Sequence, residues 1–150
     1  MKKIVLIMLL MFGASYSALA IEYSWENSAG KTVSASSFKG KPVVFHFWAS
    51  WCPPCRKEMP ALVKWMGEHP DVQMVVLSLD RSRASAEDFY KKHDIKIPIN
   101  MGKMSQTSSL GVRGLPSTFI MGADGEIIKR YTGDIDWSDP AKSAEVMSWL

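Results

Sequence analysis

The sequence predicts an α/β fold with a central mixed β-sheet flanked by helices. Two strongly apolar runs, residues 42–48 and 72–79, have the composition of strands buried on both faces. Each is followed by a segment of helical periodicity, the pattern of parallel strands joined by helices. A turn signal at 123–125 between two later apolar runs predicts an antiparallel hairpin, so the sheet should be mixed.

The expected strands take their positions from these apolar runs and from the turn residues between them. The first, at the beginning of the domain, is expected to be an edge strand. The strands are expected at 22–26, 31–38 (a short strand and loop), 42–48, 72–79, 117–121 and 127–131, with a short extended piece at 95–99.

Three helices and one helical turn are expected between and after these strands. The first, 54–68, has an apolar stripe of Met59, Leu62, Val63 and Met66 and should bend at Pro60. Ser85 and Asp88 match a capping box that opens a helix to about His93. A helical turn is expected at 106–110. Asp139-Pro140 is a cap followed by a first-turn proline, opening a final helix to 150 whose apolar face would be Val146, Trp149 and Leu150.

The first twenty residues have the pattern of a secretory signal peptide. Lys2 and Lys3 precede an apolar run at 4–12, and Ala18-Leu19-Ala20 is a small-x-small cleavage site. The run is shorter than the about 20 residues of a membrane span, and an uncleaved anchor is the alternative. Cleavage would leave one globular domain, 21–150, in an oxidising compartment, best matched by a bacterial periplasm.

The net charge gives no support for nucleic-acid binding. The formal charge of +3 falls to +1 when Lys2 and Lys3 leave with the signal, and a near-neutral domain has no basic surface for a polyanion. A domain of about 130 residues also buries a sufficient core without cross-links. The two cysteines are therefore not needed as a structural staple.

Cys52 and Cys55 are the only cysteines, and they lie where the buried strand turns into the first helix. Their spacing lets two thiols on one helical turn form a disulfide. Because a thiolate is the attacking species and a helix N-terminus favours negative charge, we expect Cys52 to be a solvent-facing nucleophile. Cys55 should be the shielded thiol that resolves the mixed disulfide. A zinc site needs further ligands, and haem attachment needs histidine where Arg56 stands. No metal or organic cofactor is expected.

The two prolines between the cysteines suggest the direction of the reaction. Pro54 has no N–H to donate to a thiolate on Cys52, although Cys55 has one. Pro54 also disfavours the helical region at Pro53, so the helix should begin late. Both effects weaken thiolate stabilisation. We therefore expect a Cys52 pKa of about 7, rather than the about 3.5 of a strong oxidant.

Two words of the sequence resemble the TlpA/ResA branch of exported thioredoxin-fold thiol-disulfide oxidoreductases: residues 47–60 (FWASWCPPCRKEMP) and 111–120 (GVRGLPSTFI). The resemblance covers nearly the whole predicted domain and implies a thioredoxin-like fold. It implies that Leu115-Pro116 is a cis-proline turn facing the cysteine pair, with backbone groups that pair with an extended substrate. The implied substrate-binding residues are Trp51, Pro53, Gly114, Leu115 and Pro116.

The same resemblance implies a role for Glu58, one turn beyond Cys55. An acidic residue there lies close to the cysteine pair and is thought to tune thiol acidity and to accept or relay a proton; the alternative is a surface glutamate paired with Arg56, Lys57 or Lys64. His46 departs from thioredoxin, which has a buried acid at the matching position. It is either a proton acceptor for Cys55 or a hydrogen-bonded core histidine, and we favour the latter.

The resemblance implies a periplasmic reductant of protein disulfides, for example in cytochrome c maturation, acting through the Cys52/Cys55 dithiol-disulfide pair. Its partners would be a protein substrate with a disulfide or thiols and a membrane-bound thiol-disulfide protein that donates electrons. The domain would meet the membrane only through that donor, and nucleic acid is not a partner. One alternative is a thiol oxidant or isomerase, and another is a non-enzymatic periplasmic metallochaperone.

Overall fold

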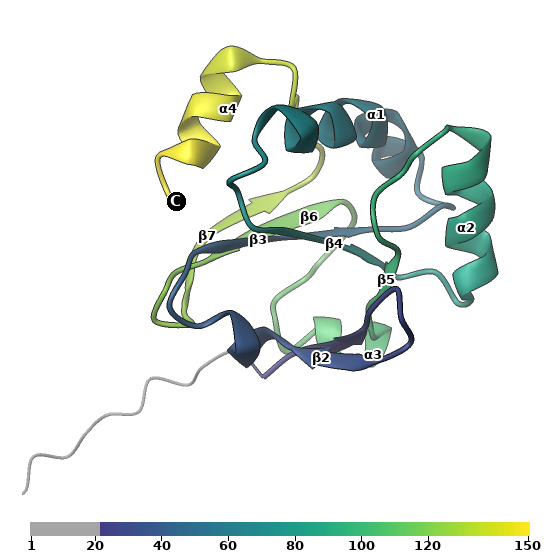
Figure 1. Ribbon diagram of the computed structural model, residues 1–150, viewed down its shortest axis with the longest axis horizontal. Coiled ribbons are helices and arrows are strands. Elements are labelled where there is room, and N and C mark those ends of the chain that lie inside the picture. The colour runs from purple at the N-terminus through teal and green to yellow at the C-terminus, as the bar shows by residue number, and fades with distance from the viewer. Residues whose placement is uncertain (1–21) are drawn as a thin grey trace, which may run out of the picture.

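The computed structural model describes residues 22–150, so the predicted signal peptide lies outside the described part of the chain. Residues 22–150 form a seven-stranded mixed sheet with helices on both faces (Figure 1), which confirms the expected fold class. The strands are β1 (Ser24–Glu26), β2 (Thr32–Ser34), β3 (Val43–Trp48), β4 (Met74–Ser78), β5 (Asn100–Met101), β6 (Ser117–Met121) and β7 (Ile127–Thr132). The helices are η1 (Ala35–Phe38), α1 (Pro53–Glu68), α2 (Arg83–Lys92), α3 (Met104–Thr107) and α4 (Pro140–Met147).

The strand order β2-β1-β5-β4-β3-β6-β7 puts β3 well inside the sheet. It pairs in parallel with β4, where His46 faces Val76, and antiparallel with β6, where Phe47 faces Ser117. All six residues of β3 are buried, as its continuous apolar run predicts. Because β3 and β6 run in opposite directions, the residues that follow β3 and those that precede β6 meet at one edge of the sheet.

Two apolar cores lie on opposite faces of the sheet. One lies under α1, α2 and α4 and includes Trp48, Met59 and Val146. The other lies under the β1–β2 segment, η1 and the segment around α3, and includes Trp25 and Phe47. Figure 1 shows α1 and α4 on one side of the sheet and α3 with β2 on the other. The cysteine pair belongs to the first core, so its surroundings come from α1 and from whatever packs against it.

The helix α1 runs without interruption through Pro60. Proline removes the N–H that would bond to the carbonyl of Arg56, but both residues are exposed, so water can satisfy that carbonyl. Of the predicted apolar stripe, Met59 and Leu62 are buried against the sheet, and Val63 and Met66 are partly buried against the same core. Trp65, which the stripe did not include, is also buried. The helix therefore holds its first turn rigidly against β3.

Three predictions about elements away from this region are wrong. β1 is not an edge strand, because β2 folds back beside it and takes the edge position. The helix α2 begins at Arg83, since Ser82 Oγ accepts the N–H of Ser85 and so provides the cap three residues earlier than predicted. The final helix ends at Met147, and Trp149 and Leu150 remain 39% and 36% exposed instead of completing its apolar face.

Between α2 and β6, the elements lie at different residues from those predicted. The extended piece 95–99 is not a strand, and the sheet is continued by the two residues of β5 that follow it. The helical turn falls at Met104–Thr107 instead of 106–110. The hairpin between β6 and β7 is confirmed, with Gly125 at φ +89° in its turn. No helix within residues 22–150 is long and apolar enough to span a membrane.

Candidate active site

The cysteine pair lies at the beginning of α1, directly after β3. Cys52 is the N-cap and Cys55 is in the first turn, and a disulfide joins them across a Cα–Cα distance of 5.3 Å. Cys55 is fully buried, as predicted, but Cys52 is only 4% exposed. The prediction that Cys52 faces solvent is therefore wrong, because the loop around it packs closely. Of the two sulfurs, only that of Cys52 belongs to a residue with any exposure.

The helix N-terminus offers Cys52 one backbone donor. The N–H of Cys55 points to Cys52 Sγ at 3.3 Å, while Pro53 and Pro54, as the first two helical residues, have no N–H. This arrangement confirms that Pro54 removes a donor and that Cys55 retains one. The helix does not begin late, however. It begins at Pro53, because the fixed φ of proline suits the first helical position.

The turn before β6 lies at the same edge of the sheet as the cysteine loop. The Leu115–Pro116 peptide bond is cis, as the resemblance implies. Ser117 pairs with Phe47 of β3, so Pro116 lies at the same edge of the sheet as the residues leading to Cys52. Within residues 22–150, no hydrogen bond involves the backbone N–H or C=O of Leu115. These two groups remain available to an extended chain laid along the edge.

Glu58 is buried and not at the surface, which excludes the ion pairs considered from the sequence. Its Oε1 accepts hydrogen bonds from the backbone N–H of Ile135 at 3.0 Å and from Trp137 Nε1 at 2.5 Å. Burial is the main cause that raises the Glu58 pKa to about 7, assisted by the charge of Asp134 and opposed by these two hydrogen bonds. Glu58 is thus a buried carboxyl, one helical turn from Cys55, whose pKa lies near neutrality.

His46 lies beside Glu58, fully buried on β3. Its Nδ1 is 2.9 Å from Thr118 Oγ1 on β6, which supports the interpretation of a hydrogen-bonded core histidine. Its Nε2 lies 3.8 Å from Glu58 Oε2. Burial lowers the His46 pKa to about 3, so the two groups are not an ion pair at neutral pH. The contact between these two residues was not predicted from the sequence.

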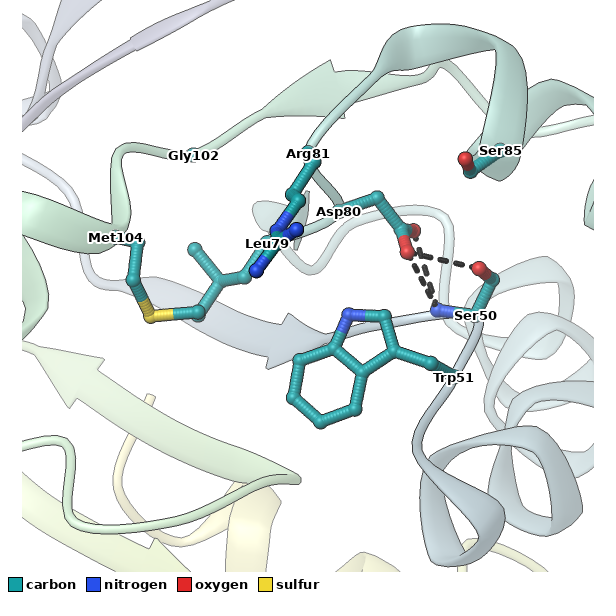
Figure 2. Close-up of a pocket in the computed structure, with 8 residues that line it drawn as sticks. All are labelled: Ser50, Trp51, Leu79, Asp80, Arg81, Ser85, Gly102 and Met104. Atoms are coloured by element: carbon teal, nitrogen blue, oxygen red, sulfur yellow. Dashed lines mark hydrogen bonds between the residues drawn. The ribbon is translucent and has the colours of Figure 1, made fainter.

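Trp51 is 60% exposed and forms one wall of a cavity of about 670 Å³ next to the cysteine loop (Figure 2). The other walls come from the ends of β4 and β5 and the beginnings of α2 and α3. The remaining lining residues are Ser50, Leu79, Asp80, Arg81, Ser85, Gly102 and Met104. Trp51 therefore lines an open, partly apolar space next to the cysteine loop. Trp48, by contrast, is buried against Tyr90 and Phe89.

Asp80 ties the cysteine loop to the end of β4. Its carboxylate accepts hydrogen bonds from the N–H and hydroxyl of Ser50, the latter at 2.8 Å, and from the hydroxyl of Ser78 at 2.8 Å (Figure 2 draws the bonds to Ser50). Because Ser50 is two residues before Cys52, these bonds fix the approach to the reactive pair. The sequence predicted a strand that ends at 79 and indicated no role for Asp80. An acidic residue directly after a buried strand could have indicated a partly buried carboxylate with hydrogen-bond partners.

The described residues contain no cluster of three or more histidine, cysteine or acidic side chains with the spacing of a metal site. His69 stacks on Trp65 at the end of α1, and His93 is exposed at the end of α2. Both lie near helix ends. The buried histidine and acidic residues within residues 22–150 are His46, Glu58 and Asp80.

The chain is similar to known proteins of one family. The family model described as Redoxin matches residues 18–147. The thiol-disulfide oxidoreductase ResA of Bacillus thuringiensis is 32% identical over 108 residues, which are 70% of this chain and 62% of that protein. The thioredoxin-like protein YneN of Bacillus subtilis is 33% identical over 118 residues, 76% of this chain and 69% of that protein.

The fold has a close counterpart among solved structures. StoA from Bacillus subtilis superposes with a TM-score of 0.68 at 27% identity, covering 88% of this chain and 98% of that one. These matches confirm the resemblance and the thioredoxin-like fold expected from the two sequence words. The match spans 62% of the length of the ResA protein of Bacillus thuringiensis.

Proposed function

Because the chain belongs to the Redoxin family, we propose that it is a thiol-disulfide oxidoreductase that reduces disulfides in other proteins. The observation that carries this proposal is the Cys52–Cys55 disulfide at the N-terminus of α1, at the same edge of the sheet as the turn that contains Pro116. The two sulfurs already form the oxidised state of such a reaction, and the helix N-terminus favours the thiolate of the reduced state.

The proposed reaction begins with the reduced pair. The Cys52 thiolate attacks one sulfur of the substrate disulfide, a mixed disulfide forms, and the first substrate thiolate leaves. Cys55 then attacks Cys52 Sγ, the mixed disulfide breaks, and the second substrate thiolate leaves. Two electrons pass to the substrate, and this protein is left with the Cys52–Cys55 disulfide. The difference in exposure supports these roles, since Cys52 retains 4% exposure and Cys55 has none.

Glu58 is proposed to take the proton of Cys55. The Cys55 thiol must lose its proton before its sulfur can attack, and Glu58 is the buried carboxyl one turn further along α1. A group with a pKa of about 7 can accept a proton and release it again at the same pH, which suits a general base. The substrate thiolates take their protons from water, so the proton count is balanced.

Substrate binding is assigned to the residues around Cys52. Trp51, Pro53 and Gly114 are exposed, while Leu115 and Pro116 form the turn beside them. The unbonded backbone groups of Leu115 would pair with an extended substrate segment, as in β-strand addition. Trp51 would supply apolar contact area next to the attacked sulfur.

The proposed direction is reduction. A single N–H donates to Cys52 Sγ, because prolines occupy the first two helical positions. A weakly stabilised thiolate has a pKa of about 7 and belongs to a pair with a reduction potential nearer −270 mV than −120 mV, roughly the values of a reductant and of a strong oxidant. The alternative, a thiol oxidant or isomerase, uses the same residues. A measured reduction potential near roughly −120 mV would establish this alternative.

The cellular setting is also a proposal. We assign residues 1–20 to a signal peptide and 21–150 to a thioredoxin-like domain in the periplasm, with cytochrome c maturation as the pathway. The basic and apolar beginning of the sequence supports export. In an oxidising compartment the pair must be reduced again after each turnover, so a membrane-bound thiol-disulfide protein is the proposed electron donor.

The experiment that tests this function is a trap for substrates. Cys55→Ser should accumulate a mixed disulfide through Cys52, because the resolving thiol is absent, and mass spectrometry would identify the captured protein. Cys52→Ser is the matched control and should capture nothing. Zinc and copper analysis of the reduced protein tests the metallochaperone alternative. Tight metal binding that depends on Cys52, together with no capture by Cys55→Ser, would overturn the proposal.

A further inference from the structure

Three buried side-chain polar atoms lack a hydrogen-bond partner among residues 22–150, and two of them face each other. They are His46 Nε2 and Glu58 Oε2, separated by 3.8 Å. An unpaired buried polar atom is costly, and native proteins contain few of them. Two such atoms, aimed at each other beside a redox pair, indicate a hydrogen bond that the site can form in some of its protonation states.

The other end of each side chain is anchored. Glu58 Oε1 is held by the N–H groups of Ile135 and Trp137. His46 Nδ1 is 2.9 Å from the buried hydroxyl of Thr118, for which the structure of residues 22–150 shows no second partner. A hydroxyl can donate or accept, so this contact suits an Nδ1 with or without a proton. The His46 ring is therefore fixed in place while its tautomer can change.

We propose that His46 is a positioning residue that lets the buried Glu58 change charge, by accepting a hydrogen bond from the carboxyl and donating one to the carboxylate. In the first state Nε2 is bare and Nδ1–H donates to Thr118. In the second state Nε2–H donates to Glu58 and the Thr118 hydroxyl donates to Nδ1. A movement of about 1 Å closes the gap to hydrogen-bond length. The inference rests on the proposed function, in which Glu58 takes the proton of Cys55.

The proton count is balanced in this exchange. When the Glu58 carboxylate gains the proton of Cys55, the imidazole moves its single proton from Nε2 to Nδ1 and stays neutral. The carboxyl loses its negative charge, and Cys55 gains one as a thiolate. An apolar residue at position 46 would leave Glu58 Oε2 without a donor, which would hold Glu58 in the protonated form.

The surroundings of His46 favour a neutral imidazole over an ion pair with Glu58. Thr118 on β6 and Val76 on β4 flank it in the sheet, and the Trp137 ring lies edge-on at 6.3 Å. The titratable groups of this region are Glu58 on α1, Asp134 beyond β7, which acts on Glu58, and the cysteine pair. Burial lowers the His46 pKa to about 3, so the imidazole remains neutral across the range in which Glu58 titrates.

Nitrogen NMR of the histidine-labelled, oxidised protein tests the tautomer directly. We expect the His46 ring to change from Nδ1–H to Nε2–H as the pH rises through about 7, the pKa of Glu58, with no imidazolium signal. His46→Asn assigns the resonances, and Glu58→Gln should abolish the transition. A single tautomer at every pH, or a ring protonated at both nitrogens, would overturn the inference.

Three substitutions should affect the Glu58 pKa differently: one raises it, one lowers it and one leaves it unchanged. The infrared band of the Glu58 carboxyl measures this pKa, and Glu58→Gln assigns the band. His46→Leu should raise the Glu58 pKa by about one unit, a tenfold change in ionisation, because leucine cannot donate. Thr118→Val should lower the pKa, because the protonated state needs an acceptor for Nδ1–H. His46→Asn should restore the wild-type value, since an amide can donate or accept. A Glu58 pKa that is unchanged in Thr118→Val, or in a folded His46→Leu, would overturn the inference.

Two controls keep the result interpretable. Leu77→Ala removes a buried side chain on the opposite face of the sheet and should lower stability without moving the Glu58 pKa. Reduction of insulin by the wild-type protein tests the proposed function separately. If insulin is reduced but the tautomer is fixed, only the role of His46 fails. If insulin is not reduced, the proposed function fails whatever the tautomer does.

Discussion

Two buried carboxyl groups lie on either side of the cysteine loop, and they are held in opposite ways. Asp80, on the side of the Trp51 cavity, has hydrogen bonds to both of its oxygens, all from Ser50 and Ser78. Glu58, on the side of the helix core, has two donors on one oxygen and none on the other. Their exposures are almost the same, 7% and 5%. Burial alone therefore does not distinguish them.

The difference lies in what each oxygen meets. Donors on both oxygens satisfy the hydrogen-bonding capacity of a buried carboxylate and tie together the segments that supply them. A carboxyl with one unsatisfied oxygen and a neutral histidine beside it can take up a proton at little cost. Asp80 is thus suited to fix the loop before Cys52, and Glu58 to exchange a proton behind Cys55. The comparison predicts that the two sites respond differently to pH and to substitution.

The largest expected effect is on the pH dependence of stability. Folding raises the Glu58 pKa from 4.5 to about 7, so between these values the folded chain holds a proton that the unfolded chain has released. Folding also lowers the His46 pKa from 6.5 to about 3, so below pH 6.5 the unfolded chain holds a proton that the folded chain lacks, and this opposes the contribution of Glu58. Glu58→Gln removes only the Glu58 contribution. The free energy of unfolding of the oxidised variant should therefore rise relative to the wild type by about 3 kcal/mol as the pH rises from 4.5 to 7. Urea unfolding of both proteins at a series of pH values measures this difference, and a difference that does not vary with pH would contradict the assignment.

The second effect is on the rate of disulfide reduction. Glu58→Gln keeps an acceptor oxygen for Ile135 and Trp137 but cannot take the proton of Cys55. Because general-base groups contribute at least about a hundredfold, the step that releases the second substrate thiolate should slow by about that factor. Stopped-flow measurement of mixed-disulfide decay isolates this step. An unchanged decay rate would assign Glu58 a purely structural role.

The third effect is the loss of the loop anchor. Asp80→Ala leaves the donors of Ser50 and Ser78 without their partner, and the buried hydroxyl of Ser78 cannot fully regain water. The protein should lose about 2 kcal/mol of stability. Asp80→Asn retains an acceptor and should lose less. Urea denaturation measures both variants, and an unchanged stability of Asp80→Ala would mean that these bonds do not anchor the loop.

The smallest effect concerns the exposed wall of the cavity. Trp51 is 60% exposed, so Trp51→Ala should change stability by less than about 0.5 kcal/mol. If its ring contacts the substrate, KM for a protein disulfide should rise by roughly fivefold, equivalent to about 1 kcal/mol, with little change in kcat. Steady-state kinetics provides the test. A fall in kcat with constant KM would instead place Trp51 in the control of Cys52.

The sequence predicted those features that depend on neighbouring residues along the chain. The apolar run of β3, the turn around Gly125 and the cap at Asp139 all appear at their predicted places. Each depends on local backbone geometry or on a short periodic pattern. The cysteine spacing and the turn at Pro116 likewise followed from short words. These local patterns were sufficient to predict where the reactive pair lies in the fold.

The sequence was less informative where an element depends on a distant partner. The first strand was placed at an edge, but β2 and β5 pair on either side of it, and pairing partners leave no local mark. The start of α2 was predicted three residues too late because Ser82 and Ser85 are both acceptable N-caps. In the structure Ser82 is the N-cap, and its side chain accepts the N–H of Ser85. Trp149 and Leu150 continue the apolar pattern of the final helix, but both side chains are exposed.

The sequence by itself determined that this chain places two thiols at a strand-to-helix turn, because that needs only their spacing and the pattern around them. The environment of those thiols was decided by tertiary structure. Glu58 meets Trp137, which lies 79 residues away in the sequence, and His46 meets Thr118, 72 residues away. The pKa of a buried group is set by such contacts, because desolvation and hydrogen bonding depend on neighbours in space.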